Sequence, residues 1–492
     1  MDKTNPTAVA GRARYTSYIN VPLLLFLLLL SLFKYFLFSY FSDSAALFSA
    51  DFILVNLLIV SFCDRFRNLL LFIYNVAYFV VFISLTFINF FHFTWKSFCN
   101  SLQFYQQLDY TRYIFMALLL VGVVLALYFT PKLFFKKTPA RHRLLNILLC
   151  VVLLGISGFV QKKFLIDYHT FTTNDHTKFR KIFPLIDRGD IYNVVEEDRM
   201  FVYDLHSTDT LSSFATTMRS TPSFLKYNPD EPGAQVAVLL ESFGKLTDGP
   251  LQSLFRDSIQ QWMGNDYELV FDSVAFNGST VDGELRELFD LRGDYNKLLD
   301  AGRPFSSIFT ERKEKGYATW SVSSSGGKVF SDRQLYKAGG CDSSFFKEDL
   351  MALPYFDKGR DMDKESVFSG VRDEFSYDFL LRKLDGGQAK RFGYFLTINT
   401  HLPFWLSADT KETPAYISFH NANAAAYSND VIDLTWKFVL QLRYFVTQAA
   451  AHHLNSLLLV GDHSPPYFAS GDRAHYSQQT VPVYFIHRRV VK

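Results

Sequence analysis

The stretch SLLLVGDHSPP (residues 456–466) indicates the fold of the second half of the chain. A short apolar run that stops abruptly at Gly-Asp-His is typical of a buried strand in a parallel sheet, with polar residues at its carboxyl end. Similar apolar runs stop before Glu241 (AVLL) and Thr400 (YFLTIN), and VPVYFI follows near the end of the chain. Helix-like stretches lie between these runs, at 283–289, 369–384 and 425–448. Strands that alternate with helices predict an α/β domain whose mainly parallel sheet is sandwiched by helices.

Polar residues occur where these predicted strands meet their loops. They are Glu241, Thr280, His401, Asp462 and His463. Taken alone, an Asp-His pair after a strand is usually a cap or a hydrogen-bonding pair, and a glutamate there often neighbours a helix N-cap. The carboxyl ends of parallel strands meet at one edge of the sheet, however, so two carboxylates and an imidazole are expected to converge there. Such a set of ligands suits Zn²⁺ or Mn²⁺.

The first third of the chain is strongly apolar. Its first run, INVPLLLFLLLLSLFKYFLFSYF, exceeds the roughly 20 residues that a helix needs to cross a bilayer, and no small-residue cleavage site follows it. Four further runs are long and apolar enough for the same interpretation. The sequence therefore predicts five membrane-spanning helices, at about 19–41, 47–63, 68–91, 113–130 and 144–161.

The distribution of Lys and Arg predicts the orientation of these helices. Cationic residues precede the first span, separate the second from the third, and crowd between the fourth and the fifth. Such segments are retained on the cytoplasmic side, so the amino terminus is expected inside and everything after about residue 162 outside. We expect a transmembrane domain at 1–161, an amphipathic connecting segment at 162–233 and an extracytoplasmic catalytic domain at 234–492.

Composition excludes two other classes of protein. The 50 Lys+Arg and 48 Asp+Glu leave a net charge of +2, without the basic excess of a nucleic-acid-binding protein. Two of the four cysteines, Cys63 and Cys150, lie inside apolar runs, so a framework of disulfides is not expected.

Five motifs in order resemble the alkaline-phosphatase/sulfatase superfamily. They are ESFG (241–244), GSTVDGE (278–284), the G-Y…G-G…R…Y…G pattern of 316–340, NTHLPF (399–404) and VGDHSPP (460–466). Within the superfamily, the sequence looks most like the membrane-anchored lipoteichoic-acid synthase and phosphoglycerol transferase branch. The resemblance covers about 234–487, and the apolar anchor extends it over nearly the whole chain.

The resemblance implies a set of roles for the polar residues at the strand ends. Glu241, Thr280, Asp462 and His463 would bind one divalent metal ion, Mn or Zn, with Thr280 also the nucleophile. Coordination to a dication is one of the few ways to activate a hydroxyl that has no neighbouring base. His401 would contact the phosphoryl oxygens or protonate the departing alcohol. The alternatives are that Thr280 merely caps a helix and that His401 is structural.

One segment departs from the pattern of that branch. Where the branch has a histidine, an aromatic residue and a phosphate-binding arginine, this chain has Ser323, Phe330 and Asp332, with Arg333 one place later. Ser323, Arg333 and His401 are therefore the expected substrate-binding residues. The donor stays open between phosphatidylglycerol and phosphatidylethanolamine.

The resemblance implies a two-step transferase. Its phospholipid donor would transfer the head group through a phosphothreonine to a cell-envelope glycan or lipopolysaccharide. It also implies a multi-pass protein of the bacterial inner membrane with a periplasmic or extracellular catalytic domain. One alternative is a phosphodiesterase or sulfatase-type hydrolase, although the C/S-x-P-x-R motif of sulfatases is missing from the 278–284 turn. The other is a catalytically silent lipid-binding regulator.

Overall fold

The computed structural model describes residues 48–62, 66–91 and 222–489, together with a few isolated stretches before residue 222. The gaps after residue 222 are 228–229, 277–278, 293–297, 300–304, 328–331, 364–369, 386–388, 402–403, 405 and 468–469. The chain divides into two compact units. The first comprises Met1–Ser39, Ser44–Ile83 and Leu118–Val194, and the second comprises Tyr40–Asp43, Ser84–Ala117 and Val195–Lys492.

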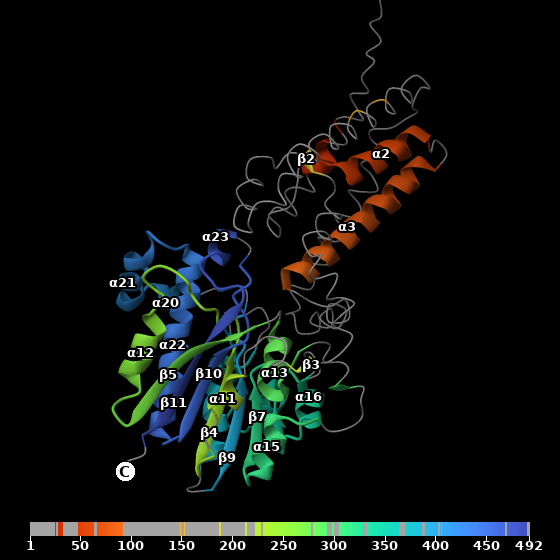
Figure 1. Ribbon diagram of the computed structural model, residues 1–492. Helices are drawn as coiled ribbons and strands as arrows, with labels where there is room; N and C mark the ends of the chain where they lie inside the picture. Colours follow the sequence, from red (N-terminus) through yellow and green to blue (C-terminus); the bar gives the residue numbers. More distant parts are fainter. Residues whose placement is uncertain are drawn as a thin grey trace, which may run out of the picture. The chain divides into compact units, whose positions relative to one another are not determined.

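The main described part of the first unit is the helix α2 (Ala50–Phe62) with the helix α3 (Arg67–Phe91) up to Ile83 (Figure 1). They are joined by reciprocal amide hydrogen bonds between Asn56 and Asn75, at 3.3 and 2.9 Å, and by the rings of Phe52 and Tyr78, 4.8 Å apart. A two-residue strand, β1 (Phe48–Ser49), pairs in parallel with β2 (Ile186–Asp187).

The two helices fall on the second and third predicted spans. Among the residues that the structure describes, no helix has both the length and the apolarity needed to cross a membrane. The other predicted spans, 19–41, 113–130 and 144–161, lie largely outside the described residues, as does most of the connecting segment 162–233. The five-span anchor and its orientation therefore stay predictions.

A seven-stranded sheet forms the centre of the second unit, in the order β5-β11-β10-β4-β9-β7-β8. Every pair from β10 through to β8 is parallel, whereas β11 is antiparallel to both of its neighbours. All the strands except β11 therefore run in one direction, which confirms the predicted mainly parallel sheet. The strands are β4 (Ala234–Leu240), β5 (Tyr267–Ala275), β7 (Ala318–Ser323), β8 (Ser343–Phe345), β9 (Arg391–Leu396), β10 (Ser456–Gly461) and β11 (Thr480–Arg488). A short pair, β3 (Ser212–Ser213) and β6 (Leu291–Arg292), lies apart from it.

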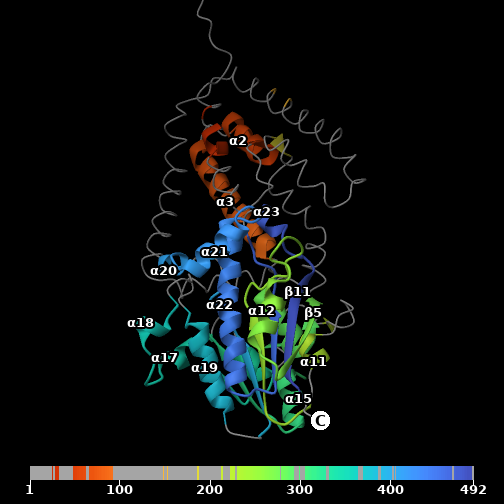
Figure 2. The same ribbon diagram turned by 90° about the vertical axis from the view of Figure 1, so that its left-hand side faces the viewer.

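Helices cover both faces of this sheet (Figures 1 and 2). Successive residues of β4 enter two different buried clusters: Val236 and Val238 join the cluster beneath α12, α19 and α22, whereas Ala237 and Leu239 join the cluster beneath α11, α13, α15 and α16. This alternation follows from the two-residue period of a strand and explains why the central strands are apolar throughout. The helices are α11 (Ser223–Tyr227), α12 (Leu254–Trp262), α13 (Thr280–Phe289), α15 (Ile308–Glu314), α16 (Asp332–Ala338), α19 (Asp373–Leu384) and α22 (Asn429–Ala451).

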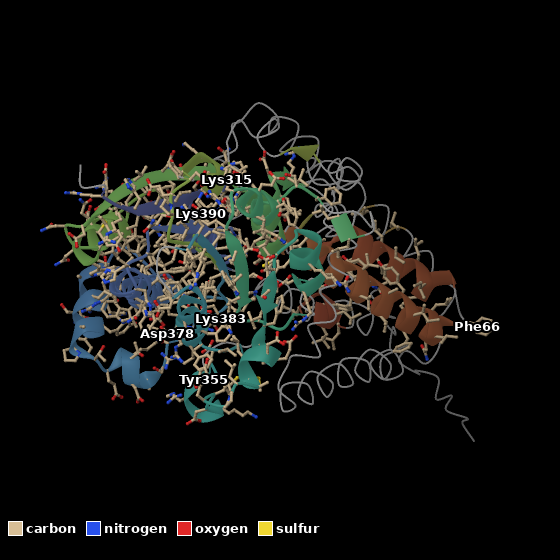
Figure 3. All side chains as sticks on the ribbon, turned by 90° about the horizontal axis from the view of Figure 1, so that it is seen from below. Phe66, Lys315, Tyr355, Asp378, Lys383 and Lys390 are labelled. Atoms are coloured by element: carbon tan, nitrogen blue, oxygen red, sulfur yellow. The ribbon has the colours of Figure 1, made fainter. Side chains whose placement is uncertain are left out.

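Lysine side chains lie over aromatic rings near the sheet and its helices, and Figure 3 labels two of these lysines, Lys383 and Lys390. The Lys383 ammonium lies 5.3 Å from the ring centre of Phe345 and 5.2 Å from that of Phe379. Lys390 lies 5.3 Å from the ring centre of Tyr317 and donates a hydrogen bond to the Lys315 carbonyl at 3.1 Å. These contacts cover apolar surface while the charged groups stay in water.

Shorter helices complete the described part of the domain. They are α17 (Lys347–Met351), α18 (Lys358–Asp361), α20 (Ala408–Lys411), α21 (Pro414–Asn423) and α23 (Ser470–Arg473). The three predicted helices exist with shifted starts, because local caps decide where a helix begins. The stretch predicted at 425–448 begins at Asn429, where the Ser428 side chain accepts a hydrogen bond from the Val431 amide.

The register places three strand ends side by side. Gly461 of β10 is opposite Leu240 of β4, and Leu239 of β4 is opposite Leu396 of β9. The residues that follow these strands therefore leave the same edge of the sheet together. They include Glu241, Thr397 and Asp462.

Candidate active site

Glu241 is held at the end of β4 through its backbone and its carboxylate. Its amide donates to Thr397 Oγ1 at 2.9 Å, and its carbonyl accepts from Thr400 Oγ1 at 2.6 Å. Its carboxylate is 1% exposed and accepts from the Ser242 hydroxyl and the Thr280 hydroxyl, both at 2.9 Å. The sequence therefore places a buried carboxylate against the hydroxyl of Thr280, 39 residues further along the chain.

The carboxylate of Asp462 has one satisfied and one unsatisfied oxygen. Oδ1 accepts from the backbone amides of Ser242 at 2.8 Å and of His463 at 2.5 Å. Within the described part of the chain, Oδ2 is buried with no hydrogen-bond partner, and it lies 3.3 Å from His463 Nε2. Because a buried, unsatisfied carboxylate oxygen is costly, this atom is suited to act as a ligand of a cation.

His463 is oriented by its own backbone. Nδ1 lies 2.8 Å from the Ser464 carbonyl, so in the neutral ring Nδ1 carries the proton and Nε2 presents its lone pair to the site. Nε2 lies 3.5 Å from Glu241 Oε1 and 3.5 Å from Thr280 Oγ1. The imidazole thus points at both the acidic pair and the hydroxyl.

The ligand atoms of Glu241, Asp462 and His463 all lie within 4.8 Å of one another. Two atoms bound to one tetrahedral zinc at about 2.0–2.1 Å are roughly 3.3 Å apart, close to the spacings of His463 Nε2 from the two carboxylates. Two acidic groups and one imidazole also match the chemistry of a Zn²⁺ or Mn²⁺ site. The residues present therefore fit a divalent metal ion.

The pKa values of His463, Glu241 and Asp462 also indicate that this cluster favours a positive charge. Burial disfavours the imidazolium of His463, but the charges of Asp462 and Glu241 raise its pKa to about 10. Burial also disfavours the Glu241 carboxylate, yet the charges of His401 and His463 lower its pKa to about 2. Burial, together with the charge of Glu241, raises the pKa of Asp462 well above its usual value. In the metal-free chain a proton on His463 thus balances charge that a dication would otherwise balance.

Thr280 is the first residue of α13, and it is not the helix cap. Ser279 is the N-cap residue, and the carboxylate of Asp282 accepts hydrogen bonds from the Ser279 amide at 2.9 Å and the Ser279 hydroxyl at 3.1 Å. The alternative interpretation of Thr280 as a helix cap is therefore wrong. Its hydroxyl is directed to Glu241 and His463 instead.

Gly283 explains how α13 comes this close to the strand end. A Cβ added to Gly283 would lie 2.9 Å from Asp462 Cβ and 3.0 Å from Asp462 Cα. No other residue type fits against that backbone without a shift of the helix or of the strand end. The glycine thus sets the separation between the helix that carries Thr280 and the segment that carries Asp462.

Two residues that the sequence did not single out support the site. Ser242 has a φ of 58°, a conformation that L-residues rarely adopt, and it contributes both its amide and its hydroxyl to the acidic pair. Arg286 of α13 is 1% exposed and donates to the carbonyls of Gly461 at 2.6 Å and Asp462 at 3.4 Å. An arginine in an amphipathic helix normally faces solvent, so the sequence contains no signal for this role of Arg286.

The remaining predicted residues lie in different surroundings. His401 follows β9, and its charge lowers the pKa of Glu241. Ser323 is buried at the end of β7, with its hydroxyl 2.8 Å from that of Ser325. Arg333 is ion-paired, at 3.0 Å to Glu348 and 2.7 Å to Asp349. Within the described residues neither Ser323 nor Arg333 contacts the metal ligands, and position 330 lies outside them.

Fold and site together define an α/β domain with a candidate metal centre beside a threonine hydroxyl. No protein-family model and no curated protein sequence matches the chain. It is similar to the solved structure of the lipoteichoic acid synthase LtaP from Listeria monocytogenes, with 15% identity, a TM-score of 0.41, and coverage of 58% of this chain and 71% of that one. It is also similar to the integral membrane lipooligosaccharide phosphoethanolamine transferase EptA from Neisseria meningitidis, with 14% identity, a TM-score of 0.46, and coverage of 94% and 88%.

A third similar structure is the Streptococcus pyogenes phosphoglycerol transferase GacH in complex with sn-glycerol-1-phosphate, with 12% identity, a TM-score of 0.34, and coverage of 52% and 69%. At these identities and TM-scores, the similarity identifies neither substrate nor mechanism.

Proposed function

We propose that this protein is a metal-dependent transferase that moves a phospholipid head group, phosphoglycerol or phosphoethanolamine, through a phosphothreonine to a cell-envelope glycan or lipopolysaccharide. One observation supports this most directly. The Thr280 hydroxyl lies 2.9 Å from Glu241 Oε2 and 3.5 Å from His463 Nε2, inside the cluster that fits a dication. A hydroxyl in that position is an activated nucleophile rather than a structural group.

Glu241, Asp462, His463 and Thr280 would hold one Mn or Zn ion. When bound, the ion lowers the pKa of the threonine hydroxyl and offsets the negative charge that develops on the phosphoryl group. Glu241 accepts the hydroxyl hydrogen at Oε2 and so aims an oxygen lone pair of Thr280 away from itself. The amides at the amino end of α13 are available to the phosphoryl oxygens.

In the first step Thr280 Oγ attacks the phosphorus of the donor, and the bond from phosphorus to the diacylglycerol oxygen breaks. The threonine proton leaves by way of Glu241, and His401 delivers a proton to the departing diacylglycerol oxygen. In the second step an acceptor hydroxyl attacks the phosphothreonine. Its proton passes to His401, and the bond from phosphorus to Thr280 Oγ breaks with return of a proton to that oxygen.

The location of the protein follows from the same proposal. A multi-pass anchor within 1–161 would hold the catalytic domain, 234–492, at the outer surface of a bacterial inner membrane. Tethering raises the effective concentration of the active site at the bilayer, where the lipid donor is found. Diacylglycerol then returns to the membrane from which the donor came.

Thr280→Ala tests the nucleophile, with Thr280→Ser as the control that keeps a hydroxyl. With labelled phosphatidylglycerol or phosphatidylethanolamine, the wild-type chain should gain a head-group phosphate on Thr280 by mass spectrometry. Thr280→Ala should lose this adduct and slow diacylglycerol release by about 10³-fold or more, because removal of a nucleophile costs at least that much. Thr280→Ser should retain part of the activity.

A second readout tests the metal. Elemental analysis should find about one divalent ion per wild-type chain, and Asp462→Ala should lower it by removing the unsatisfied oxygen. Diacylglycerol release at the wild-type rate from Thr280→Ala would eliminate the nucleophile. A labelled Thr280 that transfers its phosphate only to water would identify a phosphodiesterase.

A further inference from the structure

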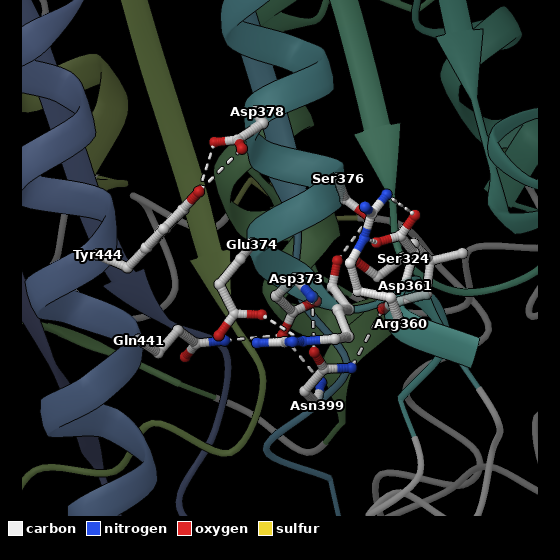
Figure 4. Close-up of polar contacts among 12 residues, drawn as sticks. Ser324, Arg360, Asp361, Asp373, Glu374, Ser376, Asp378, Asn399, Gln441 and Tyr444 are labelled. Atoms are coloured by element: carbon white, nitrogen blue, oxygen red, sulfur yellow. Dashed lines mark hydrogen bonds and ion pairs between the residues drawn. The ribbon is translucent and has the colours of Figure 1, made fainter. Parts of the chain in front are cut away.

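A polar cavity of about 540 Å³ lies beside the site, on the face of the sheet that α19 and α22 cover. Its walls come from α18, the amino end of α19, the segment after β9, α20 and the middle of α22. Figure 4 shows four of the lining residues, Arg360, Glu374, Asn399 and Gln441. The volume falls within the roughly 300–1,000 Å³ of small-molecule sites. It is therefore large enough for an organic ligand rather than an ion alone.

The cavity is connected to the catalytic group through one residue. Thr400 lines the cavity and donates through Oγ1 to the Glu241 carbonyl at 2.6 Å, while the carboxylate of Glu241 contacts Thr280 Oγ1 at 2.9 Å. Asn399, next to Thr400, also lines the wall. A ligand held in this cavity would therefore lie beside the end of β4, where the Glu241 carboxylate contacts Thr280, the proposed nucleophile.

The chemistry of the walls favours a neutral ligand rich in hydroxyl groups. Eleven of the fifteen lining residues carry polar or charged side chains, which is unusual for small-molecule cavities, since these are mostly apolar. The three cations among them are balanced by three carboxylates. Two of the cations are already paired, Arg360 with Asp361 at 2.7 Å and Arg372 with Glu374 at 3.3 Å. A site for a phosphate or another anion would instead carry excess positive charge.

The polar wall is held in place by the buried carboxylate of Asp373. It accepts hydrogen bonds from the amides of Ile398 at 3.1 Å and Asn399 at 3.0 Å and from Gln441 Nε2 at 2.7 Å. The Asn399 side chain accepts in return from the Asp373 amide at 2.6 Å, and the Asn399 carbonyl accepts from Lys437 Nζ at 3.3 Å. Figure 4 shows Asp373, Asn399 and Gln441 of this network at the start of α19.

Gln441 of α22 carries a buried acceptor that the described part of the chain leaves unpaired. Its side chain is 5% exposed and lines the cavity, and its Oε1 is buried with no hydrogen-bond partner in the described part of the chain. Its Nε2 is committed to Asp373, so the free atom is an acceptor that needs a donor such as a hydroxyl. Leu440 of α22 and Leu406 of the segment after β9 add apolar surface to the lining, suited to the C–H groups of a sugar ring.

We propose that this cavity binds a neutral sugar unit of the acceptor glycan, beside the phosphothreonine that it attacks. Its role in transfer rests on the proposed function, whereas binding of the sugar does not. The acceptor then approaches from the α19 and α22 face, and the helix that carries Thr280 packs on the opposite face. Donor and acceptor would thus reach the phosphorus from different sides of the sheet edge.

Binding is measured on the full-length chain in a detergent without sugar groups, because a glycosidic detergent would compete. The probes are the methyl glycosides of glucose, galactose and N-acetylglucosamine, with inorganic phosphate as the anionic comparison, observed by saturation-transfer NMR. Leu440→Trp narrows the cavity without removing a hydrogen bond, because Leu440 is 43% exposed and purely apolar. Leu225→Trp, at a 36% exposed leucine on α11, is the matched control.

We expect at least one glycoside to bind the wild type, and Leu440→Trp to weaken it tenfold or more while Leu225→Trp leaves it unchanged. Gln441→Leu should weaken it as well, by removal of the unpaired acceptor. Absence of binding by all three glycosides, equal binding in Leu440→Trp, or a cavity that takes phosphate in their place would overturn the proposal. Thr280→Ala should bind the glycoside normally. If Thr280 gains the head-group phosphate but no glycoside binds, only the proposed sugar site is contradicted. If a glycoside binds but Thr280 gains no phosphate, only the proposed transferase activity is contradicted.

Discussion

Arg286→Met should destabilise the α/β domain by about 3 kcal/mol, the lower end of the cost of breaking a buried ion pair. The guanidinium donates to the carbonyls of Gly461 at 2.6 Å and Ala275 at 3.3 Å, and it pairs with Glu287 at 2.8 Å, with both side chains at most 3% exposed. Methionine fills similar space but donates nothing. The carbonyls would lose their donor, and the Glu287 carboxylate would lose its counter-charge.

The cost stays at the lower end because Glu287 keeps two other partners. Its carboxylate also accepts from the Ser223 hydroxyl at 2.7 Å and the Phe224 amide at 3.1 Å, at the start of α11. Glu287→Gln preserves an acceptor for that helix while removing the charge. In the double variant, Arg286→Met with Glu287→Gln, residue 287 carries no charge that needs a counter-charge. The loss of unfolding free energy in the double variant should therefore be about 1–2 kcal/mol smaller than the sum of the losses in the two single variants.

The assay is urea unfolding of the full-length chain, followed by tryptophan fluorescence. Trp262, Trp320 and Trp436 pack against the core of the α/β domain, so the signal reports its unfolding. A single-variant cost below about 1 kcal/mol, or costs that add without coupling, would refute a structural role for the buried pair.

Two further predictions concern α13. Burial and the charge of Glu241 raise the pKa of Glu284 above its usual 4.5, so the folded chain holds a proton that the unfolded chain has released. The protonated Glu284 side chain contributes its full stability below about pH 4.5, and this contribution is lost as the pH rises toward the raised pKa. Glu284→Gln should therefore remove a slope of up to about 1.4 kcal/mol per pH unit from the unfolding free energy above pH 4.5. Parallel pH profiles of the unfolding free energy in the wild type and the variant would contradict this. Gly283→Ala should weaken metal affinity by about 10–100-fold, as elemental analysis and metal titration would show, because its Cβ meets the Asp462 backbone at 3.0 Å. Gly471→Ala, whose Cβ meets nothing within 4 Å, is its control, and equal affinity in both variants would count against the steric role of Gly283.

The sequence by itself determined the class of fold and the strand ends that carry polar residues. The strands β4, β9 and β10 are buried on both faces, so their apolar runs stand out, and two of them end visibly at Glu241 and Asp462. The third run, YFLTIN, predicts a strand that stops before Thr400, whereas β9 already ends at Leu396. Strands β5, β7 and β8 were missed. The edge strand β5 (YELVFDSVA) is only partly buried and β8 is three residues long, so neither gives a strong apolar signal.

Only the tertiary structure decided how the polar residues meet. Parallel register brings Glu241 beside Asp462, although the two are 221 residues apart in sequence. The absence of a side chain at Gly283 lets α13 pack against Asp462 and place the Thr280 hydroxyl against Glu241 and His463. The sequence also gave no sign that Arg286 would be buried or that Gln441 would be left with an unpaired acceptor. Such roles depend on which backbone groups surround a side chain after packing. A local pattern of apolar and polar residues cannot encode those neighbours, because they come from strands and helices far apart in the chain.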